Sequence, residues 1–138
     1  FQEMNEGHFI EGGALNSFGE KFDFEGKEFK PTMKYNLLGT TMNYFIENSI
    51  LDIPDYIKID VDGIEHLILE GGDKFLNDKK VKSLSIEINE NFKEQYDKVL
   101  NLMNKYEFKL LHKKHNDDMF SEQSKFKNTY NYIFKKLN

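Results

Sequence analysis

The fold is predicted most directly from Tyr56-Ile57-Lys58-Ile59-Asp60-Val61-Asp62-Gly63-Ile64-Glu65. Apolar and polar residues alternate from 56 to 61, which predicts a β-strand, and Gly63 marks its end. Three carboxylates, Asp60, Asp62 and Glu65, therefore surround the C-terminal end of a strand. Ligands of open α/β sheets bind beyond such strand ends, so these acids are candidate functional residues. The structural alternative is an acidic turn in which Asp62 or Glu65 caps the following helix.

The elements after this strand alternate between helix and strand. Hydrophobic periodicity predicts helical segments over 64–68, after 72 and over 92–106, and strands over 83–89, 108–112 and 129–137. Asn91 and Glu94 have the spacing of a capping box before the longest helix. Strands joined by crossover helices pair in parallel, whereas the last two strands, joined only by a polar loop, should pair antiparallel. The fold class is therefore α/β.

The residues before this strand predict a hairpin and one helix. Residues 1–20 are rich in glycine and favour turns. The alternation over 22–29 predicts a β-hairpin that places Phe22 opposite Phe29. Thr40 or Thr41 can cap the helix, and Pro54 prevents its continuation. The predicted apolar side of this helix consists of Met42, Phe45, Ile46 and Ile50.

Composition excludes several classes of function. The chain has 138 residues, a formal net charge of −5, no arginine and no cysteine. Nucleic-acid binding is disfavoured because phosphate tracking needs clustered positive charge and base reading commonly uses arginine. Disulfides and thiolate chemistry are excluded, and no apolar run reaches the roughly 20 residues that span a bilayer. We expect a single cytoplasmic domain over 1–138 without membrane insertion.

The segment from Lys58 to Glu65 resembles the Lys-Ile-Asp-Val-(Glu/Asp)-Gly-x-Glu motif of FkbM-type methyltransferases. The similarity continues through Leu67, Leu69, Glu70 and Gly71, the strand over 83–89 and the residues from Tyr130 to Phe134. It covers about residues 36–138, and more loosely Asn16-Ser17. The resemblance implies a Rossmann-like methyltransferase sheet and S-adenosylmethionine as methyl donor. The implied acceptor is a hydroxyl of a sugar or of a glycosylated or polyketide natural product, so the partner would be a small molecule or a glycan.

The resemblance also implies roles for individual residues. Asp60 matches the first acid of the motif and would orient the acceptor, remove its proton or hold a cation. Asp62 and Glu65 match the later acids, and Glu87, near the end of the second strand, would reach the same rim. Oxygen ligands at neighbouring strand ends suit Mg²⁺, which we keep as a lesser alternative. Lys58 either forms a cross-strand ion pair with Glu87 or lies on a hydrated face.

A donor-binding motif is missing from the sequence. Methyltransferases of this fold hold the donor with an apolar strand, a glycine-rich turn that opens a helix, and an acid at the end of the next strand. Gly12-Gly13 has no apolar strand before it, and Gly71-Gly72 interrupts a helical pattern. We therefore expect the C-terminal half of a methyltransferase domain over 36–138, preceded by a turn-rich segment and hairpin over 1–35.

Two alternatives remain open at this point. A sheet cut between its halves would expose strand edges, so the chain could be a non-catalytic remnant that folds alone or forms a homodimer. The acids at 60, 62 and 65 could instead form a divalent-cation module, although they lack the spacing of an EF-hand loop.

Overall fold

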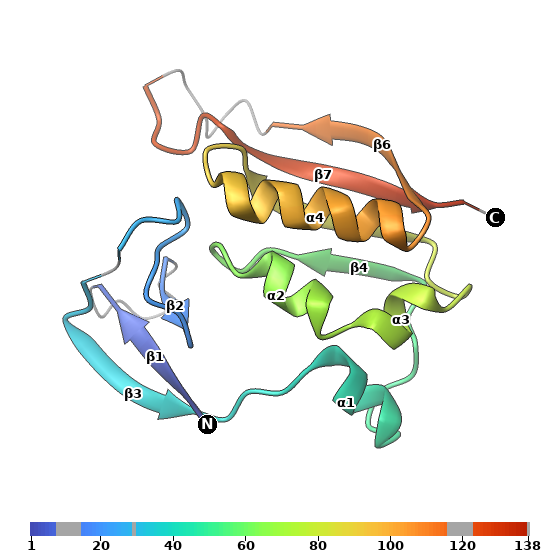
Figure 1. Cartoon of the computed structure of the whole chain (residues 1–138), viewed down its shortest axis with the longest axis horizontal. Helices are drawn as coiled ribbons and strands as arrows, with labels where there is room; N and C mark the ends of the chain where they lie inside the picture. The colour runs from blue at the N-terminus through green and yellow to red at the C-terminus, as the bar shows by residue number, and fades with distance from the viewer. Residues whose placement is uncertain (8–14, 29, 116–122, 138) are drawn as a thin grey trace.

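The computed structural model describes residues 1–7, 15–28, 30–115 and 123–137 and has a mixed α/β fold (Figure 1). A three-stranded antiparallel sheet has the strand order β2-β1-β3, and a four-stranded mixed sheet has the order β4-β5-β7-β6. The strands are β1 (Gln2–Glu6), β2 (Ser17–Phe18), β3 (Met33–Leu37), β4 (Tyr56–Ile59), β5 (Ser83–Asn89), β6 (Phe108–Lys114) and β7 (Thr129–Lys136). The helices are α1 (Met42–Glu47), α2 (Glu65–Glu70), α3 (Asp73–Asn77) and α4 (Lys93–Lys105).

The larger sheet confirms the parallel pairing of β4 with β5 and the antiparallel pairing of β6 with β7, but β5 and β6, expected to be parallel neighbours across α4, are separated by β7. β4 and β5 are parallel neighbours, and β7 pairs antiparallel with both β5 and β6. The bounds of β5 agree with the predicted strand, but β4 ends at Ile59, two residues before its predicted end at 61. The backbone turns soon after Ile59, since Asp62 and Gly63 have positive φ angles of 61° and 113°. Asp60, Asp62 and Glu65 therefore lie beyond the end of β4, outside the sheet.

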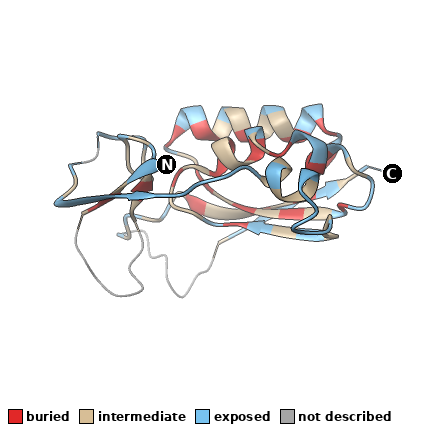
Figure 2. Ribbon diagram, turned by 90° about the horizontal axis from the view of Figure 1, so that it is seen from below, coloured by how far each residue is buried: buried red, intermediate tan, exposed pale blue. Residues whose placement is uncertain are grey.

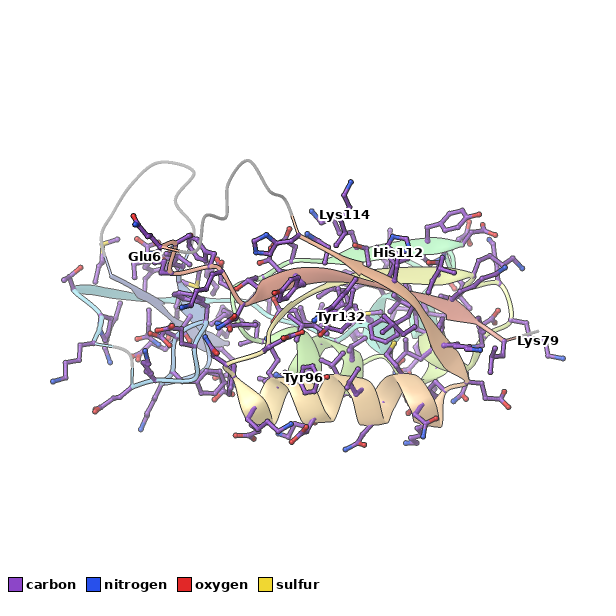
Figure 3. The ribbon with its side chains drawn as sticks, turned by 90° about the horizontal axis from the view of Figure 1, so that it is seen from above. Glu6, Lys79, Tyr96, His112, Lys114 and Tyr132 are labelled. Carbon is purple, nitrogen blue, oxygen red and sulfur yellow. The ribbon has the colours of Figure 1, made fainter. Side chains whose placement is uncertain are left out.

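The helices cover one face of the larger sheet (Figure 2). Their apolar sides pack on the inward residues of the strands, and Tyr96 of α4 lies against Tyr132 of β7 with ring centroids 6.2 Å apart (Figure 3). Among the residues that the structure describes, the opposite face carries no helix. The core consists of Ile59, Leu69, Phe75, Leu76, Val81, Leu84, Ile86, Ile88, Val99, Met103, Tyr106, Phe108, Tyr132 and Phe134.

Two helix predictions need correction. The Thr41 side chain accepts a hydrogen bond from the Tyr44 amide and caps α1, as predicted, but α1 ends at Glu47 and Ile50 is 53% exposed. The capping box before α4 is wrong, because no side chain caps that helix. The Asn91 side-chain Oδ1 instead accepts a hydrogen bond from Asn128 Nδ2, and Glu94 pairs with Lys98.

The N-terminal part differs most from prediction. The three-stranded sheet was not predicted, and the expected hairpin is a tight turn closed by a single bridge between Phe22 and Glu28. Phe29, the predicted partner of Phe22, lies outside the described residues. Within the described ranges, no helix has the length and apolar character needed to cross a membrane.

Candidate functional site

The ends of β4 and β5 bring two carboxyl groups together. Lys58 lies beside Ser85, and Ile59 lies beside Ile86 in the parallel register. Successive side chains of a strand alternate between its faces, so Asp60 and Glu87 follow on the face that no described helix covers. Their carboxyl groups are hydrogen-bonded to each other. Two carboxyl groups in contact favour a shared proton, because both cannot ionise without repulsion.

Glu87 is the titratable group whose environment best suits proton transfer. It is half-buried, and its pKa is raised from 4.5 to about 7, with burial as the largest cause. The negative charges of Asp60, Glu65 and Asp62 add to this increase, as does the hydrogen bond with Asp60. A carboxyl group with a pKa near neutrality can accept a proton and release it again at physiological pH.

The structure matches neither of the two predictions for Lys58, an ion pair with Glu87 or a hydrated face, in full. The Lys58 side chain is 63% exposed, in keeping with a hydrated face, but its Nζ is 2.8 Å from Asp60 Oδ2. The predicted ion pair with Glu87 is wrong, because the register places Ser85, not Glu87, beside Lys58. The hydrogen bond with Asp60 raises the pKa of Lys58, and Glu87 adds only a smaller electrostatic effect. Lys58 therefore fixes the position of Asp60.

Glu65 lies inside the turn and is only 1% exposed. Its Oε1 accepts a hydrogen bond from the Val61 amide at 3.1 Å, and its Oε2 accepts one from the Gly63 amide at 3.1 Å. Gln95 of α4 also donates to Oε2. Burial raises the pKa of Glu65, although the backbone hydrogen bonds act in the opposite direction. The side chain thus closes the turn between β4 and α2, and it caps no helix, since no side chain caps α2.

Asp62 joins this turn to the N-terminal part of the chain. Its Oδ2 accepts a hydrogen bond from the Leu15 amide at 2.7 Å, across 47 positions of sequence. Both residues have positive φ angles, 61° for Asp62 and 66° for Leu15. The contact fixes the segment that begins at Leu15 beside the strand ends.

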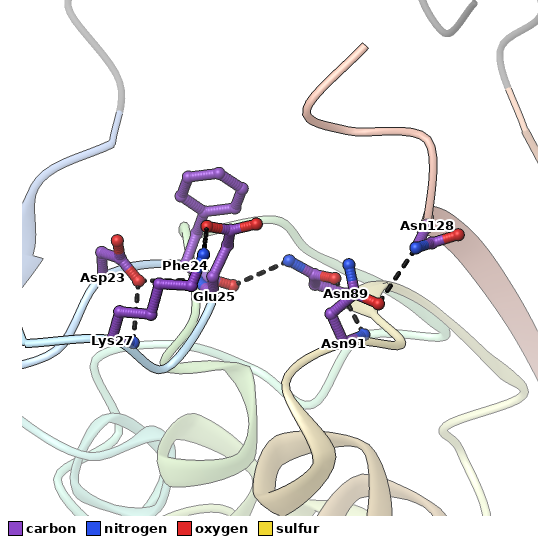
Figure 4. A network of polar contacts seen from close by, with 7 residues as sticks. All are labelled: Asp23, Phe24, Glu25, Lys27, Asn89, Asn91 and Asn128. Atoms are coloured by element: carbon purple, nitrogen blue, oxygen red, sulfur yellow. Dashed lines mark hydrogen bonds and ion pairs between the residues drawn. The ribbon is translucent and has the colours of Figure 1, made fainter. Parts of the chain in front are cut away.

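The turn over 23–27 covers the same end of the sheet (Figure 4). Asp23 Oδ1 accepts hydrogen bonds from the amides of Glu25 and Lys27, which holds the turn in shape. The Phe24 carbonyl accepts a hydrogen bond from Asn89 Nδ2 at 3.1 Å and so docks the turn on the end of β5. A small pocket remains between them, lined by Phe24, Asp62, Gly63, Glu65, Glu87, Asn89, Gln95, Phe126 and Thr129.

Sequence reasoning missed Gln95 and Phe24 as parts of this site. Gln95 is 1% exposed, and its side chain connects Glu65 with Asn89. Gln95 Nε2 donates to Glu65, and Gln95 Oε1 accepts a hydrogen bond from the Asn89 backbone amide at 3.3 Å. A signal was present, because Gln95 is a polar residue on the buried side of an amphipathic helix and needs internal partners. Phe24 carried no comparable signal, since its backbone carbonyl makes the contact.

The acids do not converge as metal ligands. In the part of the chain that the structure describes, no three His, Cys, Asp or Glu side chains are placed to hold a metal ion. Asp60 is paired with Lys58, whereas Asp62 and Glu65 accept backbone hydrogen bonds. The arrangement therefore gives no support to the Mg²⁺ alternative or to a divalent-cation module.

The turn after β4 offers no free amide pair for S-adenosylmethionine. A donor site of this kind uses free amide groups at a strand-to-helix turn. The turn after β4 has amides at Val61 and Gly63, but the Glu65 carboxylate occupies both of them. The adjoining pocket is too small for a nucleoside.

One comparison with known proteins assigns this chain to a family. The family model described as "Methyltransferase FkbM domain" matches residues 16–110, more than half of the chain. The match includes the turn over 23–27, both carboxyl-bearing strand ends and all of α4. No curated protein and no solved structure matches the chain significantly.

Proposed function

Because the chain belongs to the FkbM methyltransferase family, we propose that it forms the acceptor side of an S-adenosylmethionine-dependent O-methyltransferase. Family membership implies methyl transfer with this donor. We further assign the acceptor as a hydroxyl of a sugar or of a glycosylated or polyketide natural product. In this proposal, β4 to β7 belong to a Rossmann-like sheet, and residues other than the described ones bind the donor.

The hydrogen-bonded pair of Asp60 and Glu87 supports the assignment of a base. Methylation of a hydroxyl would form an oxygen–carbon bond while the donor's sulfur–methyl bond breaks, and it would release the hydroxyl proton, which needs an acceptor. Glu87 lines the small pocket at the strand ends, and a pKa of about 7 leaves much of it ionised at neutral pH. We assign Glu87 as the group that takes this proton.

The other predicted residues act through Glu87 in this proposal. Asp60 contacts Glu87 and keeps its pKa high, and Lys58 holds Asp60 in place. Glu65 and Asp62 are positioning residues, because their carboxylates fix the turn and the Leu15 segment.

Kinetics in a methyltransferase that contains this segment together with a donor-binding half would test the proposal. Glu87→Gln and Asp60→Asn should each lower kcat by about 10² to 10⁴, the usual contribution of a general base. The KM for S-adenosylmethionine should change by less than about twofold. Ser85→Ala is the matched control, since Ser85 lies on the same strand face beside Lys58. An unchanged kcat with a raised KM for S-adenosylmethionine would contradict the assignment.

A second candidate is a non-catalytic chain that associates through the edge of the larger sheet. β4 is the outermost strand of that sheet in the described part of the chain, and Tyr56 at its start is 74% exposed. An open edge of this kind favours pairing with another strand. Sedimentation at micromolar concentration separates the two candidates, because a monomer with a cooperative melt would remove the second one.

A further inference from the structure

A second pocket lies at the opposite end of the larger sheet from Glu87. It has a volume of about 660 Å³ and is lined by Asn77, Lys79, Lys82, Lys105, Tyr106, Glu107, Lys136 and Leu137. These residues come from the end of α3, the loop before β5, the end of α4 and the end of β7. Lys82 of the pocket lies five residues before Glu87 along β5, which separates them by about 17 Å. Lys79 marks this end of the molecule in Figure 3.

Four lysines line this pocket, with Glu107 as its single acidic lining residue. The described residues form eight ion pairs, and each uses a lysine from elsewhere in the chain. Asp78 lies nearby, but its carbonyl, not its carboxylate, accepts the hydrogen bond from Lys136. Asp78 and Glu107 act electrostatically on Lys136, and Asp73 acts on Lys105. No carboxylate of the described residues forms an ion pair with any of the four lysines, so positive charge gathers here although the chain carries a net charge of −5.

The positions of two of these lysines are fixed by the fold. Lys136 Nζ donates to the carbonyls of Leu76 and Asp78, and burial lowers its pKa. Lys82 Nζ donates to the Lys79 carbonyl at 3.2 Å. Carbonyl partners hold an ammonium group in place without neutralising its charge, so these groups are arranged to meet an anion. The volume lies within the range of ligand-binding pockets.

We propose that this pocket binds a ligand that carries phosphate groups. Ammonium groups from separate elements can contact different phosphate oxygens, and the ligand would relieve the repulsion among the four lysines. Leu137 lines the pocket and is 55% exposed, and a neighbouring pocket that shares Lys136 and Leu137 adds Leu110 and Leu111, which are 43% and 60% exposed. The phosphate could therefore belong to a soluble molecule or to a lipid head group.

Isothermal titration of the full chain with inorganic pyrophosphate tests the proposal. We expect saturable binding of one pyrophosphate per chain, which weakens as salt is added. The triple variant Lys79→Gln, Lys82→Gln and Lys105→Gln should bind at least about tenfold more weakly. Lys136 is kept because its contacts with backbone carbonyls are structural. The control Lys21→Gln, Lys30→Gln and Lys34→Gln removes the same charge elsewhere and should bind within about twofold of the unmodified chain.

Thermal melts of both triple variants establish that each is folded before affinities are compared. If the first variant does not fold, an NMR titration of the unmodified chain locates the binding site. Pyrophosphate should then change the amide chemical shifts of residues 77–82, 105–107 and 136. Absence of saturable binding, equal weakening in both variants, or shifts confined to other residues would each overturn the proposal.

Vesicles distinguish the two sources of phosphate. Phosphatidylcholine vesicles with and without phosphatidic acid are sedimented with the full chain. Pyrophosphate binding together with sedimentation that needs both phosphatidic acid and the three lysines would identify a lipid head group. Pyrophosphate binding without sedimentation would identify a soluble ligand. Sedimentation without pyrophosphate binding would overturn the pocket, because it would reflect attraction to a charged surface.

Discussion

At the scale of residues, the site contains two glutamates with different roles. Glu65 is almost fully buried and bonded to backbone amides, whereas Glu87 is half-buried and shares a hydrogen bond with Asp60. Burial raises the pKa of both. The side-chain oxygens of Glu65 accept hydrogen bonds within the protein. The carboxyl group of Glu87 lies beside the small pocket. A pair of acids is commonly divided in this way between support and chemistry.

Removal of the Glu65 carboxylate should unfold the turn. Glu65→Ala leaves the amides of Val61 and Gly63 and the side chain of Gln95 without their acceptor. We expect a loss of about 2 to 4 kcal/mol in the free energy of unfolding, measured by urea denaturation. Glu65→Gln, which keeps one acceptor oxygen, should lose less. Glu70→Ala is the control, because the Glu70 carboxylate is exposed and forms a long ion pair with Lys98, at 4.0 Å. This substitution should change the free energy of unfolding by less than about 0.5 kcal/mol. Equal losses for Glu65→Ala and Glu70→Ala would refute the structural role.

The sequence predicted which acids gather, but not how each is used. Asp60 and Glu87 could be placed together because two parallel strands end at the same edge. The direction of the Glu65 side chain could not, since it depends on Gln95 from a helix 30 positions further along the chain. The partner of Lys58 could not be predicted because alternation assigns Ser85 and Glu87 to the same strand face, and only the register shows that Ser85 lies beside Lys58.

At the scale of elements, the turn over 23–27 depends on Gly63. Gly63 has a φ angle of 113°, and a Cβ atom there would come within 3.0 Å of the Phe24 Cα and 3.2 Å of the Asp23 carbonyl oxygen. The strand-to-helix turn and the turn over 23–27 therefore pack backbone against backbone. Only glycine allows both this approach and this φ angle without strain.

Gly63→Ala should detach the turn over 23–27 from the strand ends. We expect a loss of about 2 to 4 kcal/mol, from the strained φ angle and the backbone clash together. Gly19→Ala is the matched control, because Gly19 also has a positive φ angle of 75° but its Cβ would meet only the Gln2 side chain at 3.5 Å or more. Hydrogen exchange should show faster exchange of the Lys27 and Glu25 amides in Gly63→Ala alone. Unchanged exchange in that variant would argue against docking through Gly63.

Local patterns predicted elements well where burial follows periodicity. β5 alternates between buried and half-buried residues and was predicted to its last residue, and α4 buries Val99 and Met103 as expected. Hydrophobic periodicity did not predict the burial of polar residues in α2, where Glu65 and His66 are buried along with Leu69. These polar side chains are buried because the turn and α4 surround them. The three-stranded sheet was missed because β3 is exposed throughout and shows no apolar face.

At the scale of the whole molecule, acidic and basic side chains gather at opposite ends of the larger sheet. The carboxyl-bearing ends of β4 and β5 lie on one side, and the lysine-lined pocket lies on the other. The small sheet lies beside the acidic end (Figure 1), where the Leu15 amide reaches Asp62. We propose the acidic end as the acceptor site and the lysine-lined pocket as an anion site.

The chain expressed alone should therefore not bind S-adenosylmethionine tightly. The amides of the strand-to-helix turn are occupied by Glu65, and an acidic pocket of this size cannot hold adenosine. We expect isothermal titration to show no saturable binding in the low micromolar range and no methyl transfer. Saturable binding in that range would show that the chain contains a donor site after all.

The central claim is that Glu87, hydrogen-bonded to Asp60, is the base of the acceptor site. The most direct test is a carbon-13 NMR titration of the Glu87 side-chain carboxyl in the intact chain. We predict a midpoint near pH 7, which falls in Asp60→Asn because a neighbouring negative charge is removed. Glu94 serves as an internal reference, since its hydrogen bond with Lys98 holds its pKa below the ordinary value. A Glu87 midpoint near 4.5, unaffected by Asp60→Asn, would contradict the account.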